Sequence, residues 1–132
     1  MLPAKLAELR SLRLFVEGFC AEAHVGRDHC LRLNLVLEEL FTNTVRHGHQ
    51  GDSDAPVWVV LSAAPGLVSL TYEDNAPPFN PYGRPPAASP DTTVKMRKIG
   101  GLGVLLTQKL AAFREYAYLY GRNRIRLALA LG

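Results

Sequence analysis

Apolar residues recur near the start of the chain at the three- and four-residue spacing of an amphipathic helix. The pattern predicts a helix from about Pro3 to Ala23, because proline suits the first turn of a helix and Gly26 follows as a stop. The apolar positions that define this helix are Leu2, Leu6, Leu9, Leu12, Val16 and Phe19.

A second helix is predicted to begin at Asp28, as its N-terminal cap, and to run to Arg46 or His47, with Gly48 ending it. Within it, leucines occupy alternate positions from Leu31 to Leu37, which is typical of a strand. A strand of about twenty residues would be unusual, and the segment contains no helix breaker. Helix is therefore the better interpretation.

Four short apolar and aromatic runs predict strands that form two hairpins. Turn residues join each pair, with Pro65-Gly66 in the first hairpin and Gly121-Arg122-Asn123 in the second. The predicted strands are Val57–Leu61 and Leu67–Tyr72, then Tyr116–Tyr120 and Arg124–Leu129.

The segment between the hairpins holds six prolines from Asn75 to Pro90, which exclude helix and central strand. It predicts an irregular loop, and long loops in small domains are often lids. Glycines then lead into a third helix from Leu102 to about Phe113. The order of elements predicts one α+β domain over residues 1–132, a two-layer sandwich with a mixed or antiparallel sheet and helices on one face.

Composition narrows the class of protein. A chain of 132 residues with 48% hydrophobic and 20% charged residues is globular, and its net charge of +3 without a basic run argues against nucleic-acid binding. Cys20 and Cys30 match no zinc or redox spacing and are expected to be buried thiols. No apolar stretch approaches the length of a membrane span and no signal-peptide pattern is present, which predicts a cytoplasmic protein.

Three polar residues on the second predicted helix stand four positions apart, namely Glu39, Asn43 and His47. On an α-helix this spacing aligns them along one face, although the surrounding segment is strongly apolar. Simple solvent exposure could explain each residue alone. The functional interpretation is that Asn43 offers a hard oxygen to Mg²⁺ and that Glu39 orients or deprotonates a nucleophile.

Two further clusters follow along the chain. Asp74 lies in Glu73–Phe79, where its carboxylate can accept a hydrogen bond from the exocyclic amine of a purine and the small Ala76 leaves room for a flat ring. Lys98 and Gly100–Gly103 precede the third helix, whose N-terminal amides can reach phosphate oxygens. Without any functional role, an ordinary turn would explain the residues of the first cluster, and the end of a loop would explain the glycines of the second. The common nucleotide motifs GxGxxG, Walker A and the protein-kinase set are absent.

In this order, the three clusters resemble the N, G1 and G2 boxes of the GHKL (Bergerat-fold) ATPases, and most closely the branch of anti-sigma-factor serine/threonine kinases. That branch has E-L-F-T-N-x-x-x-H-G, then E-D-x-G-x-P-F-N-P, then I-G-G-L-G. The matching segments are Glu39–Gly48, Glu73–Pro81 and Ile99–Gly103, and the resemblance covers about residues 5–130.

The resemblance implies a histidine-kinase-like ATPase domain that uses ATP and Mg²⁺. It implies that Asn43 coordinates Mg²⁺, that Glu39 is the general base or positions water, and that Asp74 recognises the adenine amine. The remaining positions that it implies for ATP binding are Arg46 and His47 near phosphate or ribose, Ala76 at the adenine, and Lys98, Gly101, Leu102 and Gly103 at the phosphates.

The chain departs from the family pattern in three places. Ala76 stands where the G1 box usually has glycine, so a methyl group narrows the adenine pocket. The first predicted helix begins almost at once, which leaves little room for the leading strand by which relatives dimerise. The lid, Tyr82–Arg97, contains several prolines and looks stiff. These departures bear on kinase activity more than on ATP binding.

The resemblance implies an anti-sigma regulatory factor that phosphorylates an anti-anti-sigma partner of the STAS type and holds a sigma factor, without contacting nucleic acid or a membrane. The alternative is an ATP-responsive module that sequesters its partner with little or no phosphate transfer. Glu39 favours the kinase, because a pure binder needs no such carboxylate. A detached histidine-kinase catalytic domain is disfavoured, since no phosphorylatable dimerisation helix precedes the domain. Homodimerisation is left open.

Overall fold

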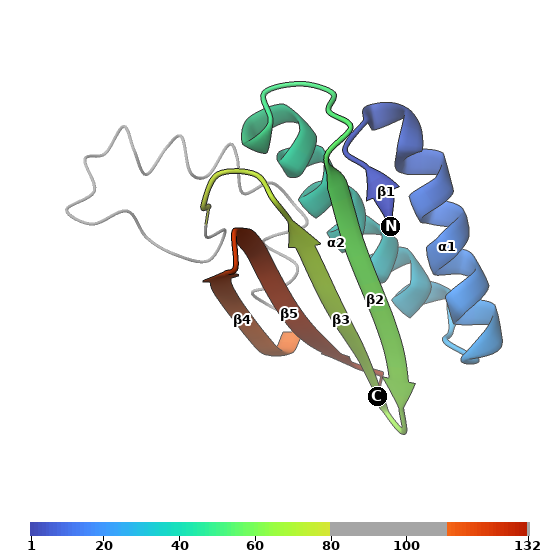
Figure 1. Cartoon of the computed structure of the whole chain (residues 1–132). Helices are drawn as coiled ribbons and strands as arrows, with labels where there is room; N and C mark the ends of the chain where they lie inside the picture. The colour runs from blue at the N-terminus through green and yellow to red at the C-terminus, as the bar shows by residue number, and fades with distance from the viewer. Residues whose placement is uncertain (80–110, 132) are drawn as a thin grey trace, which may run out of the picture.

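The computed structural model describes residues 1–79 and 111–131, in which two helices cover one face of a five-stranded antiparallel sheet (Figure 1). The strand order is β1-β2-β3-β5-β4. The predicted α+β sandwich is confirmed, with an antiparallel sheet. The helices are α1 (Leu9–Glu22) and α2 (Arg27–Asn43), and the strands are β1 (Leu2–Pro3), β2 (Pro56–Ala64), β3 (Leu67–Asp74), β4 (Ala111–Leu119) and β5 (Arg122–Ala130).

The first helix begins later than predicted, because the residues before it take other structures. β1, a strand of two residues, pairs with the start of β2 and precedes the first helix. A 3-10 turn, η1 (Leu6–Glu8), comes next. The Asp52 carboxylate accepts a hydrogen bond from the Leu6 amide at 3.0 Å and so satisfies one free donor of that turn. The N-terminal residues are therefore tied to the loop that precedes β2.

The second helix is confirmed, but both of its ends differ from the prediction. Gly26 is its N-terminal cap, whereas Asp28 lies in the first turn, where its charge suits the helix dipole. After Asn43 the chain continues as a π-helical turn, η2 (Thr44–Gly48). The α-helical geometry that was expected through residue 46 or 47 therefore ends at Asn43, and the polar residues beyond it follow a wider turn.

Both predicted hairpins are present, with longer strands than predicted. The second turn is formed by Tyr120 and Gly121, whose φ angles of 54° and 75° are those of a type I′ turn. Asn123, which was assigned to that turn, instead lies in β5 opposite Asp74. Asn123 is therefore a residue of the sheet and not, as predicted from the sequence, of a loop.

The third predicted helix is wrong at its C-terminal end. Phe113 pairs with Ala128 across β4 and β5, because the aromatic and β-forming residues of this segment extend the hairpin. The rest of that predicted helix and the predicted lid, Tyr82–Arg97, lie outside the described residues.

The core lies between the helices and the inward face of the sheet. None of the described helices has the length and apolarity to cross a bilayer. The buried side chains of this core include Leu12 and Val16 of α1, Leu33, Val36, Leu37, Leu40 and Phe41 of α2, Val45 of the turn that follows α2, and Val57, Val68, Leu70, Tyr72, Ile125, Leu127 and Leu129 of the sheet.

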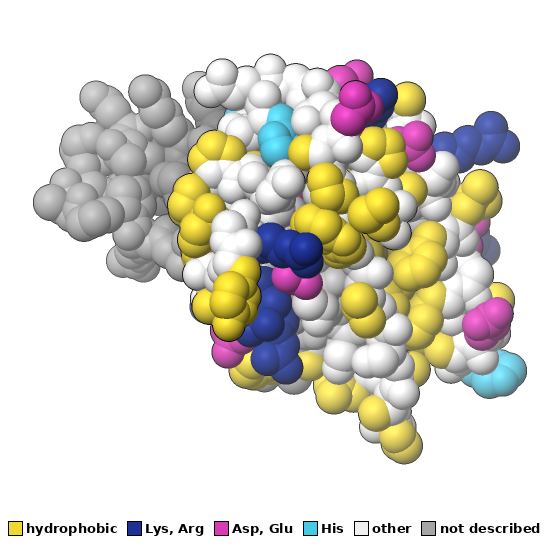
Figure 2. Space-filling model, viewed as in Figure 1, with side chains coloured by type: hydrophobic (Ala, Val, Ile, Leu, Met, Phe, Trp, Pro, Cys, Tyr) yellow, Lys and Arg dark blue, Asp and Glu magenta, His cyan; other side chains and the backbone are white. Residues whose placement is uncertain are grey.

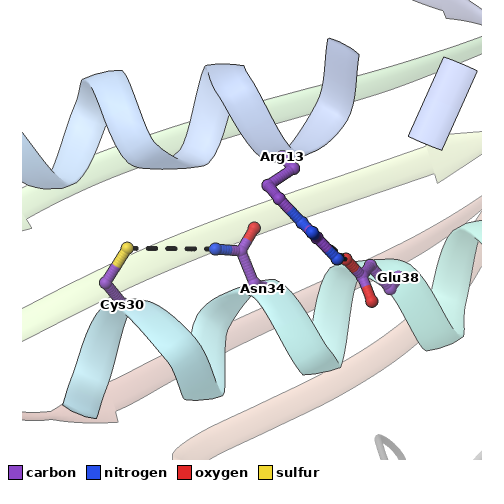
Figure 3. A network of polar contacts seen from close by, with 4 residues as sticks. All are labelled: Arg13, Cys30, Asn34 and Glu38. Carbon is purple, nitrogen blue, oxygen red and sulfur yellow. Dashed lines mark hydrogen bonds and ion pairs between the residues drawn. The ribbon is translucent and has the colours of Figure 1, made fainter. Parts of the chain in front are cut away.

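Polar side chains of α2 face α1 along one seam (Figure 3). Glu38 forms a 2.7 Å ion pair with Arg13, and the Asn34 amide is 3.9 Å from Cys30 Sγ. The Oδ1 atom of Asn34 is buried without a hydrogen-bond partner among the described residues. Both cysteines are free thiols, with Cys20 buried as predicted and Cys30 half-buried. Burial, with a hydrogen bond to Cys30, raises the pKa of Cys20 to about 12.

Candidate functional site

A cavity of about 210 Å³ lies where the end of α2, the η2 turn and the segment after β3 meet. Its wall is mostly apolar, and its few polar side chains come from elements far apart in the sequence, which is the usual composition of a small-molecule site. The polar lining residues are Asn43, Thr44, His47, Tyr72, Asp74 and Asn123, and the others are Leu40, Gly48, Ala76, Pro77, Pro78, Phe79 and Ile125.

Asp74 is buried at the end of β3 and accepts three hydrogen bonds. Its Oδ1 atom accepts from Asn123 Nδ2 at 2.8 Å and from the Ala76 amide at 3.1 Å. Its Oδ2 atom accepts from the Thr44 hydroxyl at 2.7 Å. Since a carboxylate has about four acceptor positions, one position on Oδ2 is left for a ligand in the cavity.

Thr44 links this carboxylate to a buried phenol. Its Oγ1 atom lies 2.6 Å from the Tyr72 hydroxyl and 3.0 Å from the Leu40 carbonyl oxygen. Thr44 carries a single hydroxyl proton, and the carboxylate of Asp74 only accepts, so Thr44 donates to Asp74 and Tyr72 donates to Thr44. Burial raises the pKa of Tyr72 well above its ordinary value, which keeps this donor protonated.

Asn123 holds the chain segment that follows β3. Besides its bond to Asp74, its Nδ2 atom lies 3.0 Å from the Ala76 carbonyl oxygen and 3.1 Å from that of Pro77. Its Oδ1 atom accepts hydrogen bonds from the Phe79 amide, at 2.9 Å, and from the Tyr116 hydroxyl. One buried amide therefore fixes both the carboxylate and the backbone that borders the cavity.

Sequence reasoning missed three members of this network, Thr44, Tyr72 and Asn123. Thr44 and Tyr72 sit within apolar stretches that indicate only core. A signal for Asn123 exists, because it precedes Ile125 and Leu127 at alternate positions and so occupies an inward site of a strand. An amide at such a site needs partners inside the protein.

Only some of the polar residues predicted to share one face of the second helix lie at the cavity. Asn43 and His47 line it, whereas Glu39 and Arg46 are not among its lining residues. Asn43 Nδ2 is buried and lacks a hydrogen-bond partner among the described residues, so this amide has capacity for a ligand. Burial raises the pKa of Glu39, and the nearby His47 and Arg46 charges oppose that rise.

Ala76 and Gly48 lie in close contact at the cavity wall. A Cβ atom built on Gly48 would lie only 2.8 Å from the Ala76 Cβ atom, closer than two carbon atoms approach in proteins. The methyl group at the G1 position is thus matched by the lack of a side chain at the end of η2. The size of the side chain tolerated at one of these positions therefore depends on the side chain at the other.

The chemistry of the wall fits an adenine nucleotide with its magnesium ion. Asp74 offers an acceptor to an amine, and the apolar residues around it suit a flat ring. Asn43 supplies an amide, whose oxygen is a ligand type that Mg²⁺ accepts. No cluster of three or more acidic, histidine or cysteine side chains occurs in the described ranges, so phosphate oxygens and water would complete the ion's shell. Of the predicted phosphate-binding residues, Lys98, Gly101, Leu102 and Gly103 lie outside the described residues.

The sequence is similar to known proteins over most of its length. The family model of the histidine kinase-like ATPase domain matches residues 2–129. The chain is 27% identical to the serine-protein kinase RsbW of Listeria innocua over 112 residues, which are 83% of this chain and 71% of that protein. It is 32% identical to the anti-sigma F factor of Halalkalibacterium halodurans over 62 residues, 47% of this chain and 42% of the other.

A solved structure gives a weaker likeness. The blue-light-activated histidine kinase EL346 of Erythrobacter litoralis matches with a TM-score of 0.47 and 19% identity, over 76% of this chain and 31% of its own. The family model spans nearly every residue of the protein, including the three segments that build the cavity. The chain belongs to the histidine kinase-like ATPase domain family.

Proposed function

We propose that this protein is an ATP-binding anti-sigma regulatory factor that phosphorylates a serine or threonine of an anti-anti-sigma partner of the STAS type. The observation that carries the proposal is the free acceptor position of buried Asp74 in a cavity that Asn43 also lines. Similarity to proteins named serine-protein kinase RsbW and anti-sigma F factor supports the kinase activity and the sigma-factor partner.

The adenine ring enters the cavity with its exocyclic amine toward Asp74 Oδ2. Guanine carries a carbonyl oxygen at that ring position, which the carboxylate would repel. The apolar wall, including Ile125 and Leu40, packs against the ring. We therefore expect ATP to bind in preference to GTP.

The polar residues of the N box act at the phosphates. Asn43 would hold Mg²⁺, which neutralises negative charge on the transferred phosphoryl group when bound. Glu39, one helical turn earlier, accepts the proton of the attacking hydroxyl, and burial moves its pKa toward the range useful for a base. We expect Arg46 and His47 to contact phosphate or ribose, and the resemblance to the family implies a role at the phosphates for Lys98 and Gly101–Gly103.

A second function, an ATP-responsive switch that binds its partner without phosphate transfer, is favoured by one observation. Glu39 is not among the residues that line the cavity. In this case the carboxylate would have no role in a reaction, and nucleotide would change only the affinity for the partner.

The test is phosphate transfer from γ-labelled ATP to a purified STAS-type protein encoded by a neighbouring gene, with ATP binding measured separately by calorimetry. We expect transfer to a hydroxyl side chain, a loss of about 100-fold in Glu39→Gln with ATP binding kept, and loss of Mg²⁺-dependent ATP binding in Asn43→Ala.

Glu38→Gln is the matched control, because Glu38 neighbours Glu39 but pairs with Arg13 of α1. It should transfer phosphate like the wild-type protein. ATP binding without any transfer would establish the switch instead, and a wild-type protein that fails to bind ATP would reject both functions.

A further inference from the structure

The outward face of the sheet, away from α1 and α2, is covered by no described element (Figure 1). Side chains alternate between the two faces of a strand, so the outward residues of β5 are those between its buried ones. They include Arg122, Arg124 and Arg126, which stand about 6.8 Å apart along the strand. Figure 2, in the same view, shows basic side chains beside apolar ones on this face.

Neighbouring strands place aromatic and acidic side chains among these arginines. The guanidinium of Arg122 stacks on the indole ring of Trp58, 3.7 Å from its centroid. Such stacking holds the planar group in place and leaves its edge N–H groups able to bind a carboxylate. Glu73 lies opposite Arg124 on β3, and Glu115 lies opposite Arg126 on β4.

The acidic residues of the face do not saturate its arginines. Three guanidinium groups share two carboxylates, and the shortest N–O distances in these pairs are 3.6–4.0 Å, longer than a close charge-assisted hydrogen bond. The Nε atom of Arg124 is buried and has no hydrogen-bond partner in the described part of the chain. The three guanidinium groups and two carboxylates leave this face a net positive charge, although the buried Nε atom itself is not accessible to a partner.

Apolar side chains border these charges. Val60 is 60% exposed, Phe113 46% and Leu119 41%, and all three project to this face by strand register. An antiparallel sheet commonly has one solvated face, which explains the charged residues but not the exposed apolar ones. Arginine mixed with exposed aromatic and aliphatic side chains is instead typical of protein interfaces.

We propose that this arginine face binds an extended acidic segment of a partner protein that carries a carboxylate at every second residue. An extended segment repeats its side chains on one side about every 6.8 Å, which matches the spacing of Arg122, Arg124 and Arg126. The residues between the carboxylates point away from the sheet. Other apolar residues of the partner would therefore cover Val60 on β2 and Phe113 on β4, which lie on opposite sides of β5. A second copy of the chain fits less well because it brings the same net charge of +3. Nucleic acid fits less well because the chain has no run of basic residues.

The probe is a fluorescein-labelled peptide of about 12 residues in which glutamate alternates with valine or leucine, measured by fluorescence anisotropy against the whole protein. We expect binding that weakens about tenfold or more in Arg124→Gln and Arg126→Gln and in about 0.5 M salt. A peptide with glutamine for glutamate should not bind. The result should be the same with and without ATP, so it stands apart from the kinase test.

Arg10→Gln is the matched control, since Arg10 is an exposed arginine of α1 on the other side of the sheet. It should bind the peptide like the wild-type protein, and Arg126→Lys, which keeps the charge, should lose less than Arg126→Gln. Equal binding of the glutamine peptide, or amide NMR shifts that avoid residues 122–126, would overturn the proposal. So would tighter binding of a single-stranded oligonucleotide, or self-association that Arg126→Gln abolishes.

Discussion

Asn123 and Asp74 face each other across β5 and β3, and the asparagine amide donates to the buried carboxylate over 2.8 Å. This contact connects β5 to the carboxylate that would accept a hydrogen bond from adenine. Because Asn123 also binds the carbonyl oxygens of Ala76 and Pro77, it sets the carboxylate and the cavity rim together.

Asn123→Ala should weaken binding of a non-hydrolysable ATP analogue by about tenfold, which corresponds to about 1.4 kcal/mol, because Asp74 and two carbonyl oxygens lose a donor. Asn123→Asp should be worse, since it puts a second carboxylate beside Asp74 at nearly unchanged volume. Calorimetry measures both affinities. If the aspartate variant binds as well as the wild type, the hydrogen bond has no role in nucleotide binding.

Tyr72→Phe should change how stability depends on alkaline pH. Burial raises the pKa of Tyr72 above its ordinary value of 10.0, so above that pH the unfolded chain releases a proton that the folded protein keeps. The free energy of unfolding of the wild type therefore falls as pH rises past 10. Near pH 7 the variant should be less stable by about 1 kcal/mol, through the lost bond to Thr44, and this deficit should shrink with rising pH.

Urea denaturation at a series of pH values measures this effect. Tyr120→Phe is the control, because Tyr120 is fully exposed and its hydroxyl contributes no buried contact. Parallel curves for wild type and Tyr72→Phe up to pH 11 or so would contradict the buried-phenol explanation.

Gly48→Ala should destabilise the protein by about 1–3 kcal/mol and lower its affinity for ATP, since the added methyl group would lie 2.8 Å from the Ala76 Cβ atom. Ala76→Gly in the same chain removes the opposing methyl group and should restore most of both losses. Thermal melting and nucleotide titration of the two single variants and the double variant form the test. Additive losses in the double variant would show that the two positions do not interact.

Asn34→Leu should raise the free energy of unfolding by about 1 kcal/mol, because it removes a buried Oδ1 atom without a partner among the described residues. Within the described ranges, the one side-chain hydrogen bond lost is the weak 3.9 Å contact to Cys30 Sγ. Asn34→Asp should lower stability instead, since it buries a charge between the helices. A leucine variant less stable than the wild type in urea would reveal a partner for this amide.

Local pattern was enough to predict most of the fold, because helices and hairpins are specified by residues near one another. Pro65-Gly66 marks its turn, and the length of the second helix outweighs its alternating leucines. Phe113 was misassigned because its strand depends on pairing with Ala128, a partner 15 positions away that no local pattern identifies. Local propensity does not show which residues distant in the sequence will pair.

The candidate site also contains residues that the sequence reveals and residues that it does not. Asn43 and Asp74 stand out in the sequence because polar residues interrupt apolar segments there. Thr44 and Asn123 do not, since their importance comes from which atoms the strand register sets beside Asp74. Whether Glu39 acts as a base stays a prediction.

We expect the π-helical turn at the end of the second helix to open locally more readily than the helix itself. The amides that follow the turn bond back over five or six residues, from His49 to the Thr44 carbonyl and from Gly51 to that of Val45, instead of the four of an α-helix. We expect these amides to exchange with deuterium by local opening, at a lower free energy than the global unfolding that exposes Leu37 or Phe41. A nucleotide held by Asn43 and Asp74 would then slow exchange at η2 far more than in α2, so that wall of the cavity would report occupancy directly.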